Sequence, residues 1–272
     1  MSDPQDAKPP ISMLWESADP AAALTDRFGF VSKGEAADWL SGVLADHWGI
    51  RVEACERLVI SDANCLAWVV VDGRRMIAKW SMRQAVFARL AAIARLTSWL
   101  DERGVPVSAP QPARDGRVQV EVGGFSLGLQ NVVDGDLLDI ADPAQVQAAG
   151  EMLATMHAAM AEYPGAIPAG EPKAPCTQLV GNDFRSANVL WADGRIAAVL
   201  DLEEARYRRR VDDLAQAAVL LGTRYHGWSP TPADVRGAFV AAYESVLPLS
   251  QHQAAALEDV IEAYLMRMTW SG

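Results

Sequence analysis

Cysteine is scarce in this sequence. The three cysteines, Cys55, Cys65 and Cys176, are odd in number and scattered along the chain. No two of them form a C-x-x-C pair, so their spacing indicates neither a disulfide framework nor a zinc site. We therefore expect reduced, buried thiols, as in a cytoplasmic protein.

Long apolar runs are also missing. No stretch approaches the ~20 apolar residues that a membrane span needs. The segment Met1–Asp6 is polar and acidic, without the apolar core of a signal peptide. These features predict a cytoplasmic protein with no membrane partner.

Positive charge is in short supply. The chain has 24 Lys and Arg against 35 Asp and Glu, a net charge of −11, with a pI near 4.8. Such a charge argues against a nucleic-acid partner, whose phosphates would be repelled. It suits a soluble enzyme and is compatible with a cationic small-molecule substrate, but it says nothing of the oligomeric state. With 272 residues, half of them hydrophobic, the chain can form one large domain or two lobes.

The residues best suited to chemistry lie between positions 179 and 201. Two apolar runs, Val189–Trp191 and Ile196–Leu200, are separated by an Ala-Asp-Gly turn and predict a hairpin that follows a loop. The hairpin would bring Asn188, where its first strand starts, close to Asp201, where its second strand ends. Asp183 lies in the loop just before. Carboxylate and amide oxygens are the ligands that Mg²⁺ prefers, and such a site keeps positions for phosphate oxygens and water.

The spacing within this stretch sharpens the prediction. Asp183 and Asn188 form D-x-x-x-x-N, and Asp201 follows, which is the kinase order of catalytic Asp, metal-binding Asn and metal-binding Asp. On these residues the chain resembles the aminoglycoside phosphotransferase and choline kinase family of small-molecule kinases. That family has H-G-D-x-x-x-x-N in the loop and a later D-[FWL]-E segment, here Asp201-Leu202-Glu203.

The resemblance implies a role for each of these residues. Asp183 would orient the substrate hydroxyl and accept its proton, while Asn188 and Asp201 would hold Mg²⁺. Arg185 would contact the γ-phosphate, with a solvated arginine as the alternative.

The same resemblance implies an α+β, bilobal, protein-kinase-like fold, and it covers the chain from about residue 51 onward. The pattern predicts a tail and helices over residues 1–50, a small nucleotide-binding lobe over 51–132, and a larger, mostly helical catalytic lobe over 133–272. The small lobe would hold five antiparallel strands, with a helix after the third. Strands are expected at 51–60, 66–71, 76–81, 117–122 and 125–132; helices at 21–28, 33–48, 83–103, from 143 onward, and at 211–221, 232–247 and 251–269; and a disordered tail at 1–12.

The nucleotide would be bound by the small lobe. Lys79, on the third predicted strand, corresponds to the family's lysine that holds the α- and β-phosphates, unless it is a surface lysine. There is no G-x-G-x-x-G loop; Ser61 and Asn64 lie in the turn that would replace it, which is equally consistent with a plain polar turn. Backbone groups near Gln130 and Val132 would pair with the base, and they do not choose between ATP and GTP.

Two positions depart from the family pattern in the small lobe and the loop. The helix after Lys79 has no glutamate near Ile93 to pair with the lysine. Gly181 stands where the family has a histidine that anchors the catalytic loop, and glycine adds backbone freedom. Asn182 is an alternative brace.

Two further residues are expected to be structural. Asp213, in a D-L-A segment, is implied to brace the loop, and His157 is expected to be a core histidine with one hydrogen bond.

Taken together, the sequence predicts an ATP- and Mg²⁺-dependent phosphotransferase that acts on a hydroxyl of a small molecule. An antibiotic of the aminoglycoside or basic-peptide type is the first expectation. A small-metabolite kinase for choline, homoserine or a sugar is an alternative, as is a catalytically impaired, kinase-like nucleotide-binding protein. The short Gly/Pro-rich segment 164–178, where relatives carry substrate-recognition helices, leaves the acceptor open.

Overall fold

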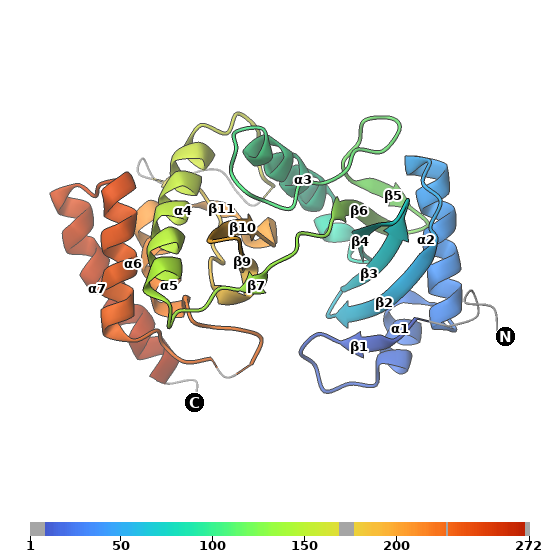
Figure 1. The fold of residues 1–272 in the computed structure, drawn as a ribbon, viewed down its shortest axis with the longest axis horizontal. Coiled ribbons are helices and arrows are strands. Elements are labelled where there is room, and N and C mark those ends of the chain that lie inside the picture. The colour runs from blue at the N-terminus through green and yellow to red at the C-terminus, as the bar shows by residue number, and fades with distance from the viewer. Residues whose placement is uncertain (1–8, 169–176, 227, 270–272) are drawn as a thin grey trace. The chain divides into compact units, whose positions relative to one another are not determined.

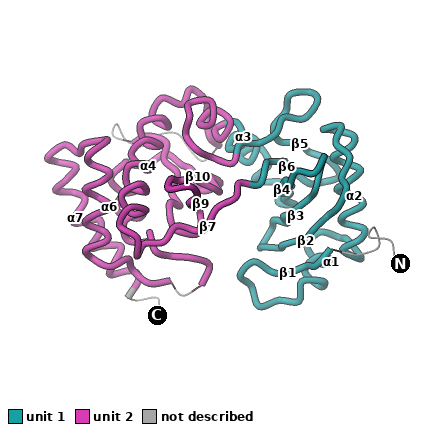
Figure 2. The backbone as a smooth tube through the Cα atoms, in the orientation of Figure 1, with its two compact units in different colours: residues 1–95, 109–132 teal, residues 96–108, 133–272 magenta. Residues whose placement is uncertain are grey.

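The computed structural model describes residues 9–168, 177–226 and 228–269. It divides into two compact units, residues 1–95 with 109–132, and residues 96–108 with 133–272 (Figure 2). The first unit carries the larger sheet and the second carries most of the helices (Figure 1). The predicted α+β class is therefore confirmed, while the predicted domain boundaries stay predictions.

Unit 1 is built on a six-stranded sheet in the order β1-β2-β3-β4-β6-β5. All neighbouring strands pair antiparallel except β1 and β2, which are parallel. Five of the strands are those predicted from the sequence. The strands are β1 (Ile11–Met13), β2 (Ala54–Ser61), β3 (Asn64–Val71), β4 (Arg74–Ser81), β5 (Val120–Val122) and β6 (Phe125–Asn131).

The sixth strand, β1, corrects the prediction of a disordered tail over residues 1–12. The amide of Leu58 donates to the carbonyl of Pro10, and the amide of Leu14 donates to that of Ile60. Ile11 and Met13 also pack against the core of the unit. Edge hydrogen bonds and apolar burial together order this short segment; residues 1–8 lie outside the described residues.

Two N-terminal helices complete the core of unit 1. Helix α1 (Pro20–Phe28) is capped by Asp19, which accepts from the amide of Ala21, and α2 (Lys33–Trp48) is capped by Ser32. Both end at a glycine in the left-handed conformation.

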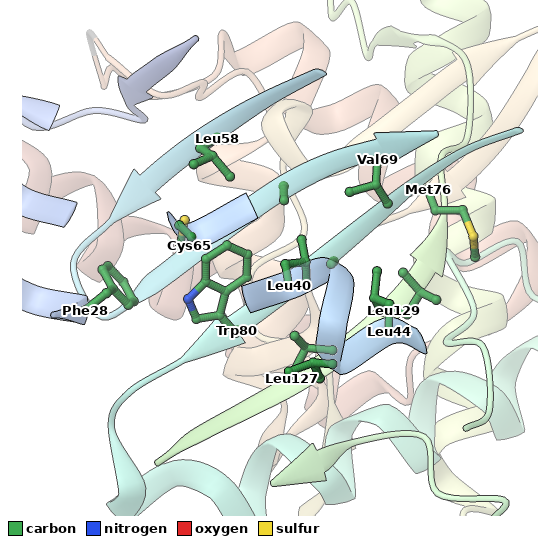
Figure 3. Close-up of a cluster of buried hydrophobic side chains, with 14 of the residues drawn as sticks. Phe28, Leu40, Leu44, Leu58, Cys65, Val69, Met76, Trp80, Leu127 and Leu129 are labelled. Atoms are coloured by element: carbon green, nitrogen blue, oxygen red, sulfur yellow. The ribbon is translucent and has the colours of Figure 1, made fainter. Parts of the chain in front are cut away.

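The apolar side of α2 packs on one face of the sheet. Leu40 and Leu44 of α2 lie against sheet residues such as Trp80, Leu127 and Leu129, and all five side chains are at most 1% exposed (Figure 3). This burial makes the helices part of the lobe's hydrophobic core.

The described cysteines, Cys55 and Cys65, are free thiols. Burial raises the pKa of the Cys55 thiol to about 11 and raises that of Cys65 as well. Cys176 lies outside the described residues.

The helix that follows the third antiparallel strand is shorter than predicted. A 3-10 turn (Gln84–Val86) precedes α3 (Phe87–Asp101), so the helix starts later and stops earlier than the predicted span 83–103. The division between the two units falls within α3.

Unit 2 is mostly helical, as predicted. Helix α4 packs against α6, and α5 packs against α7. The helices are α4 (Pro143–Ala161), α5 (Arg210–Leu220), α6 (Ala233–Val246) and α7 (Gln251–Thr269). Among the described residues, no helix is long and apolar enough to cross a membrane.

Short strands supply the rest of unit 2. The predicted hairpin is present as β9 (Val189–Ala192) and β10 (Arg195–Val199), with β7 (Asp136–Leu137) on the far side of β9. A second pair, β8 (Thr177–Val180) and β11 (Arg206–Arg209), was missed, because we expected a loop at residues 179–180 and a run of arginines gives no strand pattern. This pair brackets the hairpin in sequence.

A buried polar cluster joins three helices of unit 2. His157 of α4 is fully buried and bonds through Nε2 to Asp213 of α5 (2.9 Å) and through Nδ1 to Tyr243 of α6 (2.8 Å). His157 is therefore a core histidine, with two hydrogen bonds instead of the one expected. Asp213 is thus bonded to α4, and its expected role as a brace of the catalytic loop stays a prediction.

Candidate active site

The loop that carries Asp183 runs from the end of β8 to a 3-10 turn at Ser186–Asn188. Its far end is fixed by the segment after α5, because the amides of Ser186 and Ala187 donate to the carbonyls of Leu221 (2.8 Å) and Thr223 (3.3 Å). Backbone hydrogen bonds thus hold the two residues that lead into Asn188.

Asp183 is held between two donors. Its Oδ1 accepts from Arg185 Nε at 2.9 Å, and its Oδ2 accepts from Asn188 Nδ2 at 2.7 Å. Asn188 Nδ2 also donates to the backbone carbonyl of Asp183 at 2.9 Å. The carboxylate is therefore oriented by contacts on both of its oxygens.

Opposing effects act on the protonation of Asp183. Burial raises its pKa above the usual value, and the nearby charge of Asp201 adds to the rise. The charge and hydrogen bond of Arg185 and the hydrogen bond of Asn188 lower it, without cancelling the effect of burial. A carboxylate with a raised pKa is a better proton acceptor than an exposed aspartate.

Arg185 is not a solvated arginine, since its side chain is only 14% exposed. Besides Asp183, its Nη1 donates to the carbonyl of Arg224 at 2.9 Å. Its Cζ lies 5.1 Å from the ring centroid of Trp228. These contacts keep a fixed positive charge beside Asp183.

The β9–β10 hairpin relates Asn188 and Asp201 as predicted. Val189 pairs with Val199, and the amide of Leu200 donates to the carbonyl of Asn188 at 2.8 Å. Asp201 follows with φ 54°, a left-handed conformation that few side chains adopt. Strained backbone of this kind is concentrated at functional sites.

The oxygen atoms of Asn188 and Asp201 suit a hard cation that takes its remaining ligands from phosphate groups. Among the described residues, no three His, Cys, Asp or Glu side chains group closely enough to hold a metal by themselves. Because Nδ2 of Asn188 is engaged by Asp183, its Oδ1 is the atom suited to a cation, beside a carboxylate of Asp201. One carboxylate and one amide suit Mg²⁺, which keeps several waters and phosphate oxygens.

The residues predicted to bind nucleotide share one face of the unit 1 sheet. Lys79 pairs with Leu66 and Gly128, and Ser61 pairs with Asn64 at the end of the β2–β3 hairpin. Directly paired residues point to the same side of a sheet, and successive residues along a strand point to opposite sides. Trp80 and Ala78 point into the core under α2, so Lys79 lies on the opposite face.

The turn predicted to replace a phosphate loop has only two residues, Asp62 and Ala63. The amide of Asp62 donates to Glu16 Oε1 at 2.9 Å, and its carboxylate accepts from Arg83. Ser61 is only 5% exposed. Binding of phosphate at Ser61 or Asn64 stays a prediction, and it would require the tip to give up some of these contacts.

The segment predicted to contact the base continues β6. Gln130 pairs with Ile77 of β4, and the amide of Val132 donates to the carbonyl of Arg75 at 3.1 Å. A base could pair with the Val132 amide only after that bond is broken. The roles of Gln130 and Val132 therefore stay predictions.

One pair of contacts was only partly foreseen. The side chain of Asn182 accepts from Arg208, and its carbonyl accepts from Gln216. The sequence suggested Asn182 as a brace but gave no partner, because Arg208 lies in a run of arginines that resembles a solvated face.

Comparison with known proteins places these residues in a family context. Residues 165–257, which contain the loop and the hairpin, match the model of the phosphotransferase enzyme family. No curated protein matches the chain.

Solved structures share the fold over most of the chain. An amicoumacin kinase in complex with AMP-PNP, Ca²⁺ and Ami covers 82% of each chain at 15% identity, with a TM-score of 0.63. A macrolide 2'-phosphotransferase from Brachybacterium faecium covers 84% of this chain and 88% of its own at 17% identity, TM-score 0.60. A microcompartment-associated aminopropanol kinase covers 83% and 85% at 15% identity, TM-score 0.61. The predicted kinase-like fold and the resemblance to phosphotransferases are confirmed.

Proposed function

We propose that this chain, whose residues 165–257 match the phosphotransferase enzyme family, transfers the γ-phosphoryl group of ATP to a hydroxyl of a small molecule. The observation that carries the proposal is the state of Asp183, a half-buried carboxylate fixed by Arg185 and Asn188 at the base of the hairpin that leads to Asp201. Since ATP is a cytoplasmic substrate, we place the protein in the cytoplasm.

Asp183 would act on the acceptor. Its carboxylate would hold the hydroxyl in line with the γ-phosphate and take its proton as the new P–O bond forms and the bond to the β-phosphate oxygen breaks. Arg185, fixed beside it, would stabilise charge that spreads over the transferred phosphoryl oxygens.

Three residues would bind the nucleotide and its metal ion. Lys79 would bind the α- and β-phosphates as a point charge. Asn188 and Asp201 would hold Mg²⁺, which supplies charge neutralisation on the β- and γ-phosphates when it is bound. GTP remains an alternative donor.

We favour an antibiotic as acceptor, of the aminoglycoside or basic-peptide type. Support comes from the acidic charge of the chain and from its structural likeness to an amicoumacin kinase and a macrolide 2'-phosphotransferase. A small-metabolite kinase is the second candidate, because an aminopropanol kinase has the same fold. The predicted recognition segment 164–178 lies mostly outside the described residues.

Replacement of Asp183 and Asp201 tests the proposal. Asp183→Ala should abolish turnover and leave the affinity for ATP within about threefold, because the carboxylate acts on the acceptor. Asp201→Asn should abolish Mg²⁺-dependent ATP binding, because a cation ligand loses its charge. Titration calorimetry with MgATP and an ADP-release assay over a panel of antibiotics and amino alcohols measure both effects.

Asp193→Asn is the matched control for Asp201→Asn. Both aspartates have positive φ in the same hairpin region, and asparagine tolerates that conformation. The control should bind and turn over as the wild type does. Wild-type turnover by Asp183→Ala would exclude the assignment, and MgATP binding by the wild type without turnover on any acceptor would favour a catalytically impaired nucleotide-binding protein.

A further inference from the structure

Asn182 immediately precedes Asp183 and is held unusually firmly. Its backbone has φ 66°, and its side chain and backbone are nearly buried, at 8% exposure. Its Oδ1 accepts from Arg208 Nη1 at 2.6 Å, and its carbonyl accepts from Gln216 Nε2 at 2.6 Å. Both short bonds act on the residue that directly precedes Asp183.

The two partners of Asn182 belong to a closed set of hydrogen bonds. Arg208 Nη1 also donates to Gln216 Oε1 (2.8 Å), and its Nη2 donates to the hydroxyl of Tyr264 (2.9 Å). The Tyr264 hydroxyl in turn donates to Gln216 Oε1 (2.9 Å). We call Arg208, Gln216 and Tyr264 the loop clamp. Its members come from β11, α5 and α7.

The hydrogen bonds of the loop clamp offset the free-energy cost of the left-handed backbone conformation of Asn182. A non-glycine residue in the left-handed region costs on the order of 1 kcal/mol, and Gly181 next to it favours no single conformation. Hydrogen bonds from a guanidinium are about twice as strong as neutral ones, and a planar fork can hold two acceptors at once. The clamp therefore has enough interaction energy to keep one loop geometry populated.

We propose that Arg208, Gln216 and Tyr264 are positioning residues for phosphoryl transfer, which hold Asn182 so that Asp183 meets the acceptor hydroxyl. The inference rests on the proposed function. It assigns the anchoring of the catalytic loop, at a position where Gly181 offers no side chain, to three residues distant in sequence.

Single changes in the clamp test the inference. Arg208→Ala and Tyr264→Phe should lower kcat, by about a hundredfold and about fivefold respectively, with the KM for ATP within about threefold. Arg208→Lys should fail to rescue, because an ammonium group lacks the planar fork. Turnover is followed as ADP release from MgATP, with the acceptor found in the screen or with water alone.

Arg209→Ala is the matched control. Arg209 is the next residue of β11 and its exposed side chain pairs with Asp212 instead of Asn182. It should leave kcat unchanged. A double variant, Arg208→Ala with Asn182→Gly, should lose no more activity than the worse single variant, because the two residues share one interaction and glycine tolerates positive φ.

Amide hydrogen exchange gives a readout that does not depend on turnover. In Arg208→Ala, the amides of residues 182–188 should exchange at least about tenfold faster, while those of α4 exchange as in the wild type. If the wild type shows no turnover but this local change occurs, the proposed function fails and the clamp stands. If exchange in the loop and kcat both stay at wild-type values, Arg208 does not hold the loop. If exchange rises throughout unit 2, Arg208 only stabilises the fold, and either result overturns the inference.

Discussion

At the scale of single residues, the state of Asp183 depends on a balance between burial and two neighbours. Burial raises its pKa, whereas Arg185 and Asn188 lower it. A proton acceptor works only when it is deprotonated, so turnover should fall as the pH falls through this raised pKa. The neighbours therefore decide the acid limit of the reaction.

Arg185→Gln should move that limit to higher pH. Loss of the guanidinium removes an effect that lowers the pKa of Asp183, so this pKa rises further and the acid limb of the kcat profile moves to higher pH. The kcat is measured from pH 5 to 9. Arg224→Gln, which removes an exposed arginine whose carbonyl alone contacts Arg185, should leave the limb in place. An acid limb for Arg185→Gln at or below the wild-type position would contradict the account.

The spacing of residues in the sequence predicts part of this site but not the rest. Asp183, Asn188 and Asp201 stand in a fixed order along one loop and hairpin, so a local pattern indicates them. Arg208 and Tyr264 meet only after β11 and α7 have folded. A contact between distant elements leaves no local pattern, which is why the clamp could not be predicted.

At the scale of elements, two glycines of unit 2 differ in the space that surrounds their Cα atoms. A Cβ at Gly150 of α4 would lie 2.8 Å from Cβ of Ala242 and 2.9 Å from the amide nitrogen of Tyr243, both on α6. A Cβ at Gly181 would meet only Leu202 and Met156, at 3.8 and 3.9 Å. The first glycine is required by helix packing, and the second is not required by space.

Alanine at the two positions should have opposite effects. Gly181→Ala should stabilise the protein by about 0.5 kcal/mol, because the unfolded chain loses freedom and nothing in the fold must shift. Gly150→Ala should destabilise it by about 2 kcal/mol through overpacking. Urea unfolding of both variants measures the difference. A destabilised Gly181→Ala would mean that this position needs the freedom of glycine.

The elements themselves were largely predictable where their periodicity is strong. Helices at 33–48 and 251–269 agree with α2 and α7, and the hairpin at 189–200 agrees with β9 and β10. Strand β1 and the β8–β11 pair were missed because each is short. Their pairing is decided by partners far along the chain, such as Leu58 for β1.

At the scale of the whole molecule, each unit has its own means of stabilisation. In unit 1 the helices α1 and α2 close an apolar core over the sheet. In unit 2 the buried cluster of His157, Asp213 and Tyr243 ties α4, α5 and α6 together. We therefore expect nucleotide binding by unit 1 to depend on α1 and α2, although neither helix carries a binding motif.

Leu40→Ala should show that dependence. Leu40 is fully buried in α2, so truncation should cost about 3 kcal/mol of unfolding free energy. MgATP binding should then fail at a lower temperature than in the wild type. Asp46→Ala, at an exposed position of the same helix, should stay within about 0.5 kcal/mol. Urea titrations followed by tryptophan fluorescence measure both variants. Equal unfolding midpoints for Leu40→Ala and the wild type would show that burial of Leu40 in α2 does not stabilise unit 1.

The loop clamp has a consequence for how such a chain is inherited. If the clamp replaces a single anchoring side chain, Arg208, Gln216 and Tyr264 are expected to be retained together in chains that have glycine at position 181. Tyr264 lies in α7, beyond residues 165–257 that match the phosphotransferase family model, so a search restricted to the matched residues would recover only two of the three clamp residues. A related chain with histidine at position 181 would be free to lack all three clamp residues.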